Sequence, residues 1–168
     1  LFADKLGPGY VADAFRWARA ADTKALLFYN DYNIDAFGDG GTGDKTQFVY
    51  DMVKRLLAEG VPSDGVGSQA HLGTQYGNYD VFQLADALKR FTDLGLATAL
   101  TEVDVRSLTQ SADDPARAAN PADTNARDQA SAYNYHALMQ ACLMNRHCLS
   151  FTVWGFTDKH SWIPGWFK

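Results

Sequence analysis

The sequence is short of positive charge and of long apolar runs, and each shortage excludes a class of function. Its 15 Lys and Arg residues are outnumbered by 20 Asp and Glu residues, which gives a formal net charge of -5. A surface that binds nucleic acid or an anionic membrane needs clustered Lys and Arg, so neither partner is expected. No apolar run approaches the roughly 20 residues of a membrane span. The opening residues, LFADKLGPGY, also lack the basic and apolar segments of a signal peptide.

Cysteine is scarce as well, with only Cys142 and Cys148 in the stretch ACLMNRHCLS. This spacing is not that of a zinc knuckle, and there is no second pair, so a metal site is not expected. The two residues either form a disulfide that closes a short loop or remain as two buried thiols, and the sequence leaves both alternatives open. A disulfide would indicate an oxidising compartment.

Helix-like and strand-like segments alternate along the chain. Apolar residues at helical spacing predict helices over 10–21, 45–60, 81–95 and 125–146. Short apolar runs predict strands over 24–31, 64–72, 96–105 and 149–156. Gly60 and Gly95 are expected to end the second and third helices. This alternation predicts an α/β fold with a parallel sheet, in one domain over residues 1–168 without an internal boundary.

Polar side chains collect where each predicted strand ends, in the sequences YND, QAH, TEVD and VWGFTD. The carboxyl ends of parallel strands lie at one edge of the sheet, where the following loops converge and ligands bind. Four polar strand ends in the same register therefore predict a functional site at this edge.

Two carboxylates lie at the end of an otherwise apolar strand, Glu102 and Asp104. Side chains two residues apart on a strand point to the same side, so both are expected to face the site. His71 ends the neighbouring predicted strand and is placed to donate a hydrogen bond to either carboxylate, which favours the ionised form. The structural alternative is an ion pair with Arg106, but an oriented, ionised carboxylate is also what nucleophilic catalysis needs, and we favour that interpretation.

Aromatic and amide side chains accompany these acids in the predicted loops. Flat aromatic faces stack on the C–H faces of sugar rings, and amide groups form hydrogen bonds with hydroxyls. The residues of this kind at the strand ends are Asn30, Tyr32, Gln69, Trp154 and Trp162. This composition is typical of a carbohydrate-binding site.

A stretch rich in Asp, Asn, Ala and Pro lies between the third strand and the last helix and predicts a long surface loop. Four of its residues carry oxygen atoms that suit calcium: Asn120, Asp123, Asn125 and Asp128. We favour a solvated loop with helix caps over a calcium site, and no cofactor or metal is expected.

Several motifs resemble, in order, the C-terminal half of glycoside hydrolase family ten, the endo-β-1,4-xylanases. They are LGPGYVADAFRWARAAD, LLFYNDYNI, GVPSDGVGSQAHL, LGLATALTEVDVR, CLMNRHC and FTVWGFTDKHSWIPGWF. The resemblance implies a (β/α)8 TIM barrel, of which this chain holds roughly strands five to eight. It also implies a secreted enzyme that hydrolyses xylan with retention of anomeric configuration.

The resemblance implies a role for each candidate site residue. Glu102 resembles the nucleophile that forms the glycosyl-enzyme intermediate, and His71 and Asp104 resemble the pair that orients it. The other positions are expected to line the substrate cleft, with Gln69, Trp154 and Trp162 on the donor side and Asn30 and Tyr32 on the acceptor side.

One part of the family pattern has no counterpart here. A retaining glycosidase needs two carboxyl groups about 5–5.5 Å apart, and the family's acid/base is a glutamate in a VNE motif, which is absent. We therefore expect the acid/base to lie outside this chain, and the N-terminal half of the barrel to be its partner. Two alternatives remain: an inactive or sugar-binding homologue or fragment, and a metal-dependent barrel hydrolase with His71, Glu102 and Asp104 as ligands.

Overall fold

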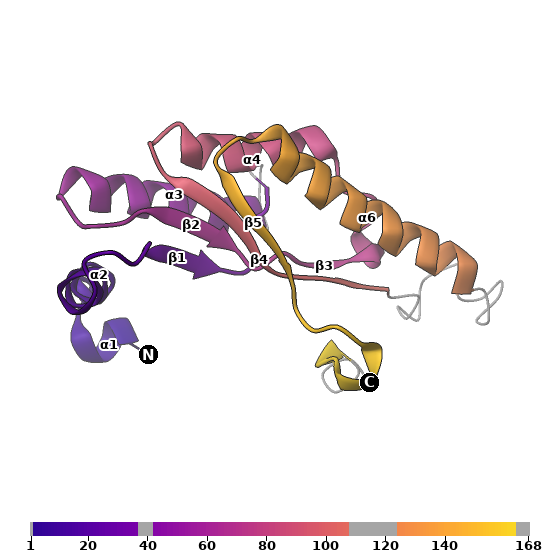
Figure 1. Cartoon of the computed structure of the whole chain (residues 1–168), viewed down its shortest axis with the longest axis horizontal. Coiled ribbons are helices and arrows are strands. Elements are labelled where there is room, and N and C mark those ends of the chain that lie inside the picture. The colour runs from indigo at the N-terminus through magenta and orange to yellow at the C-terminus, as the bar shows by residue number, and fades with distance from the viewer. Residues whose placement is uncertain (1, 37–41, 108–123, 164–168) are drawn as a thin grey trace.

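A computed structural model describes residues 2–36, 42–107 and 124–163, which form a five-stranded parallel sheet with helices packed against it (Figure 1). The strands are β1 (Phe28–Asp31), β2 (Gly65–Ser68), β3 (His71–Gly73), β4 (Ala97–Arg106) and β5 (Cys148–Val153). The helices are α1 (Phe2–Leu6), α2 (Tyr10–Ala21), α3 (Thr42–Ala58), α4 (Val81–Thr92) and α6 (Thr124–Met144). Two short 3₁₀ turns cover Thr74–Tyr76 and Asp158–His160.

The strands lie side by side in the order β1-β2-β4-β5, and every pair is parallel. This arrangement confirms the predicted α/β class and parallel sheet, and the four long predicted helices occur close to their expected bounds. Helices α3, α4 and α6 lie along one face of the sheet (Figure 1). The carboxyl ends of the strands consequently meet at one edge, as the polar strand ends predicted.

The prediction of one continuous strand over 64–72 is wrong. Ala70 has a positive φ of 58°, which breaks the run into β2 and β3. Both segments pair with β4, β2 along its first half and β3 opposite Asp104–Arg106. His71 therefore begins a separate strand rather than ending β2, and it lies directly opposite Asp104.

Two apolar cores hold the helices to the sheet. One joins α2 and α3 to β2, and the other joins α4 and α6 to β4. Full burial of one Val, Leu or Phe side chain stabilises a fold by roughly 1.5–3 kcal/mol. These cores fix the strands, and through them the side chains at the strand ends.

The beginning and end of α4 follow the sequence signals. Asp80 precedes α4, and its Oδ1 accepts hydrogen bonds from the Phe82 and Gln83 amides at 2.8 and 2.9 Å. Such a cap stabilises a helix by about 1 kcal/mol. Gly60 and Gly95 follow α3 and α4 with φ angles of 69° and 85°, which glycine adopts without strain.

The last strand is tied to the last helix, and within the described residues it pairs with β4 alone. Cys142 on α6 is bonded to Cys148 at the start of β5, so the structure has the disulfide rather than two thiols. Leu149 and Val153 on β5 are 55% and 50% exposed.

Within the described ranges, none of the helices is both long and apolar enough to cross a membrane.

The predicted long loop lies mostly outside the described residues. This applies to Asn120 and Asp123, which were considered for calcium, while Asn125 and Asp128 belong to α6.

Asn134 provides a test of how α6 is fixed. Its fully buried side chain accepts a hydrogen bond from the Tyr79 amide at 3.0 Å and donates one to the Gly77 carbonyl at 3.3 Å. Asn134→Ala leaves both backbone groups without this partner, so we expect it to lower the free energy of unfolding by about 1–3 kcal/mol. Urea denaturation measures this loss, with the exposed Gln140→Ala on the same helix as control. Equal stability of the two variants would contradict the prediction.

Candidate active site

The centre of the site is an imidazole ring placed between two carboxylates of one strand. His71 Nδ1 lies 3.0 Å from Asp104 Oδ1, and Nε2 lies 3.4 Å from Glu102 Oε2. Glu102 and Asp104 point to the same side of β4, as their spacing predicted, and β3 holds His71 opposite them. The structure thus brings together the three residues that the sequence singled out.

This geometry bears on the protonation of the ring. An ionised carboxylate only accepts hydrogen bonds, and a neutral imidazole donates from one nitrogen only. Since both ring nitrogens of His71 face carboxylate oxygens, the ring can donate to both only as an imidazolium.

The other oxygen of Glu102 is bound from the edge of the sheet. Asn30 on β1 donates from Nδ2 to Glu102 Oε1 at 3.1 Å. The Thr101 hydroxyl donates to Asn30 Oδ1 at 2.7 Å, which fixes the amide with its nitrogen toward Glu102. Glu102 therefore has a hydrogen-bond donor, Asn30, on one oxygen and the His71 ring 3.4 Å from the other, from two different strands.

Gly67 leaves the space that this contact requires. A Cβ atom at this position would lie 2.6 Å from Asn30 Oδ1 and 2.9 Å from Thr101 Cγ2, closer than van der Waals contact permits. Any side chain on β2 here would displace the Asn30 amide from its position beside Glu102. The glycine thus belongs to the site although it contributes no chemistry.

Two tryptophans surround His71. Trp162 donates from its indole nitrogen to Asp104 Oδ2 at 2.6 Å, and its ring centroid lies 5.2 Å from that of His71. Trp154 follows β5, and its ring lies nearly perpendicular to that of His71, with 6.4 Å between the centroids and 80° between the planes. Asp104, only 6% exposed, has both oxygens bound and so acts within the site rather than on a ligand.

A cleft of about 550 Å³ opens beside this cluster. Of the predicted binding residues it is lined by Tyr32, Gln69 and Trp162, together with His71. Trp154 lines a neighbouring cavity of about 320 Å³ instead, which also contacts Asp104. Asn30 is placed at Glu102 rather than in the lining of the cleft.

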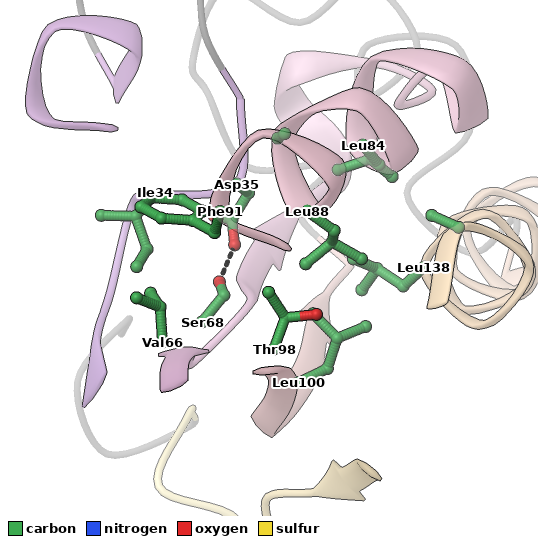
Figure 2. Close-up of a pocket in the computed structure, with 12 residues that line it drawn as sticks. Ile34, Asp35, Val66, Ser68, Leu84, Leu88, Phe91, Thr98, Leu100 and Leu138 are labelled. Atoms are coloured by element: carbon green, nitrogen blue, oxygen red, sulfur yellow. Dashed lines mark hydrogen bonds between the residues drawn. The ribbon is translucent and has the colours of Figure 1, made fainter. Parts of the chain in front are cut away.

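A further acid lies behind the site, on the helix-facing side of the sheet. Asp35 points into a cavity of about 10 Å³ among apolar side chains and accepts a hydrogen bond from Ser68, as Figure 2 shows. Burial raises the pKa of Asp35, against the opposing effects of the Ser68 hydrogen bond and of the positive charges of His71 and Lys45. Burial also raises the pKa of Tyr79, and the negative charge of Asp35 adds to that effect. Asp35 thus links the segment after β1 to β2 through a titratable contact.

Three of these residues were missed by sequence reasoning, namely Gly67, Thr101 and Asp35. Gly67 and Thr101 act through contacts between β1, β2 and β4, which depend on strand register. The only signal for Asp35 was a carboxyl shortly after a predicted strand, and that pattern also describes an ordinary surface loop.

The geometry does not favour the metal-site alternative. Among the described residues, no three His, Cys, Asp or Glu side chains are arranged so that they could hold a metal ion. His71 uses both of its nitrogens toward Asp104 and Glu102, so neither is directed at a common centre.

Comparison with known proteins identifies relatives of the whole chain. The model of the family described as "Glycosyl hydrolase family 10" matches residues 1–168. Endo-1,4-beta-xylanase B of Thermotoga neapolitana is 38% identical over 163 residues, which are 97% of this chain and 42% of that protein. Endo-1,4-beta-xylanase 2 of Aureobasidium pullulans is 37% identical over 175 residues, covering 99% of this chain and 44% of that protein.

Solved structures agree with the sequence relatives. Xylanase 10B of Thermotoga petrophila, crystallised in complex with xylobiose, superposes with a TM-score of 0.81 at 35% identity. The match covers 99% of this chain and 46% of that structure. The sheet and helices described here therefore correspond to part of a TIM barrel, and the chain spans less than half the length of each of these three relatives.

Asp35 yields a prediction about stability and pH. Because its folded pKa is raised, its contribution to stability is complete below the ordinary value of about 3.9 and is lost as the pH rises through the folded value. Asp35→Asn cannot ionise, so it does not undergo this loss. We therefore expect the free energy of unfolding of Asp35→Asn, relative to that of the unaltered protein, to increase as the pH rises from 4 toward 8. Urea titrations across this range measure the difference, with the exposed Asp51→Asn as control. Parallel pH profiles for Asp35→Asn and the unaltered protein would refute the assignment.

Proposed function

The chain belongs to glycosyl hydrolase family 10, and from this membership we propose that it forms the C-terminal part of a single barrel domain that cleaves β-1,4-xylan. The proposed enzyme is endo-acting and works by double displacement with retention of configuration. The observation that carries the proposal is the position of Glu102 beside the cleft, with Asn30 donating a hydrogen bond to one carboxylate oxygen and His71 Nε2 lying 3.4 Å from the other.

Glu102 is the proposed nucleophile. Its carboxylate attacks the anomeric carbon of the sugar on the donor side, and the glycosidic oxygen leaves with the rest of the polymer. Asn30 and His71 hold the carboxylate in a fixed orientation, so little of its freedom has to be lost in the transition state. Water then hydrolyses the glycosyl-enzyme and restores the β configuration.

His71 and Asp104 supply the electrostatic support for this cycle. When Glu102 becomes a glycosyl ester it loses its negative charge, and an isolated imidazolium beside it would be left without a counter-ion. Asp104, bound to Nδ1 of the same ring, remains ionised and balances that charge through both steps. The Trp162 indole keeps Asp104 in position.

The general acid/base is proposed to come from outside these 168 residues. A retaining mechanism requires a second carboxyl about 5–5.5 Å from the nucleophile, reaching the glycosidic oxygen. Asp104 cannot fill this role, because it lies on the same strand as Glu102 and both of its oxygens are bound within the cluster.

The aromatic and amide residues complete the proposed substrate site. We assign Gln69, Trp154 and Trp162 to the donor side of the cleft and Tyr32 to the acceptor side, where ring stacking would hold successive xylose units. Asn30, also expected on the acceptor side, is proposed to act on Glu102 as well. The Cys142–Cys148 disulfide fits a secreted protein, since such bonds persist in oxidising compartments.

The proposed role of Glu102 as nucleophile can be tested in the full-length protein that the gene encodes. Glu102→Ala is expected to lower xylan hydrolysis on the order of 10⁴-fold or more, the scale seen when one member of a catalytic unit is removed. Xylan binding should persist, because the aromatic residues are unchanged. With 2,4-dinitrophenyl β-xylobioside and azide, the variant should release the α-glycosyl azide, in which the anomeric configuration is inverted.

Glu59→Ala is a suitable control, since Glu59 is exposed, directly follows α3 and makes no contact with the three residues of the cluster in the hydrogen bonds and ion pairs described above. Failure of azide to restore turnover would argue against Glu102 as the nucleophile. Xylan binding without hydrolysis by the unaltered protein would select the sugar-binding alternative.

A further inference from the structure

Lys45, in the first turn of α3, makes a set of contacts that the proposed mechanism does not use. Its Nζ donates to Asp31 Oδ1 and to the Tyr32 carbonyl, both at 2.7 Å. The same Nζ lies 3.5 Å from the centroid of the Tyr32 ring. One ammonium group therefore holds both the backbone and the ring of the residue that follows β1.

Tyr32 is the residue that this arrangement controls. Its side chain is 53% exposed and lines the cleft of about 550 Å³ beside His71. With Lys45 against one face, the ring can offer only its other face to a ligand. An unrestrained surface tyrosine would instead exchange between rotamers and lose entropy when a ligand ordered it.

The ammonium is itself anchored to the sheet. The Asp31 carboxylate accepts hydrogen bonds from the Tyr29 hydroxyl at 3.0 Å and from the Tyr32 amide at 2.8 Å. The Asp31 carbonyl accepts one from the Gln69 amide at 2.9 Å, on the neighbouring segment. Lys45 and Asp31 are only 30% and 19% exposed, so this ion pair is less screened than a pair on an open surface.

We propose that Lys45 is a positioning residue, which fixes Tyr32 as a one-sided platform for a sugar ring on the acceptor side of the cleft. The inference rests on the proposed function, because it needs a sugar polymer in that cleft. It assigns Lys45 no contact with the reacting atoms. Lys45 instead affects how firmly the leaving part of the xylan polymer is held while Glu102 attacks.

Two substrates separate this role from a general structural one. Xylohexaose places xylose units on the acceptor side, whereas the leaving group of β-xylobiosyl fluoride is a single atom. Lys45→Met should lower kcat/KM for xylohexaose about two- to fivefold, which is the roughly 0.5–1 kcal/mol of such a cation–π contact converted to a rate ratio. The loss for the fluoride should be much smaller. Lys54→Met, at an exposed position of the same helix, is the matched control.

Further variants test whether Lys45 acts through the Tyr32 ring. Lys45→Arg keeps the charge and should restore most of the xylohexaose activity. In Tyr32→Ala the platform is absent, so adding Lys45→Met should cause no further loss.

Equal losses on both substrates, or additive losses in the double variant, would overturn the proposal for Lys45 while leaving the proposed function intact. An unaltered protein that hydrolyses neither substrate would overturn the proposed function and this inference with it.

Discussion

The site depends on one interaction, the imidazole ring of His71 between two carboxylates of the same strand. The ring can reach both because β3 places His71 opposite Asp104, and that register follows from the break at Ala70, whose φ is 58°. In the β2 register, where Ser68 lies opposite Leu100, a continuous strand would place His71 opposite Val103, one residue short of Asp104. A single unusual backbone angle thus determines which charges meet at the end of β4.

The remaining members of the site limit the freedom of this cluster. Asn30 and Trp162 each bind the carboxylate oxygen that His71 does not, so neither Glu102 nor Asp104 can rotate without losing a hydrogen bond. Gly67 contributes by having no side chain, and Asp35 and Lys45 act from behind or beside the sheet. Gly67, Asp35 and Lys45 therefore shape the site without belonging to the cluster of His71 and the two carboxylates.

The sequence predicted the fold class, the long helices and the polar strand ends because these follow from local periodicity. It also predicted that Glu102 and Asp104 share a face, since strand geometry alone requires it. It could not predict the division of residues 64–72 into two strands, because Ala carries no signal for a positive φ. The contacts of Asn30, Thr101 and Lys45 were equally inaccessible, since they depend on which atoms the strand register brings together.

The two side chains that contact Glu102, His71 and Asn30, are not held equally firmly. The His71 side chain is 20% exposed and lies 3.0 Å from Asp104 beside the Trp162 ring, whereas Asn30 is exposed on β1, which within the described residues pairs only with β2. Local opening of a protein begins where few contacts must be broken. Fraying of β1 would therefore release one oxygen of the carboxylate while the histidine contact persisted. On heating, Glu102 is therefore expected to lose its hydrogen bond from Asn30 before its contact with His71.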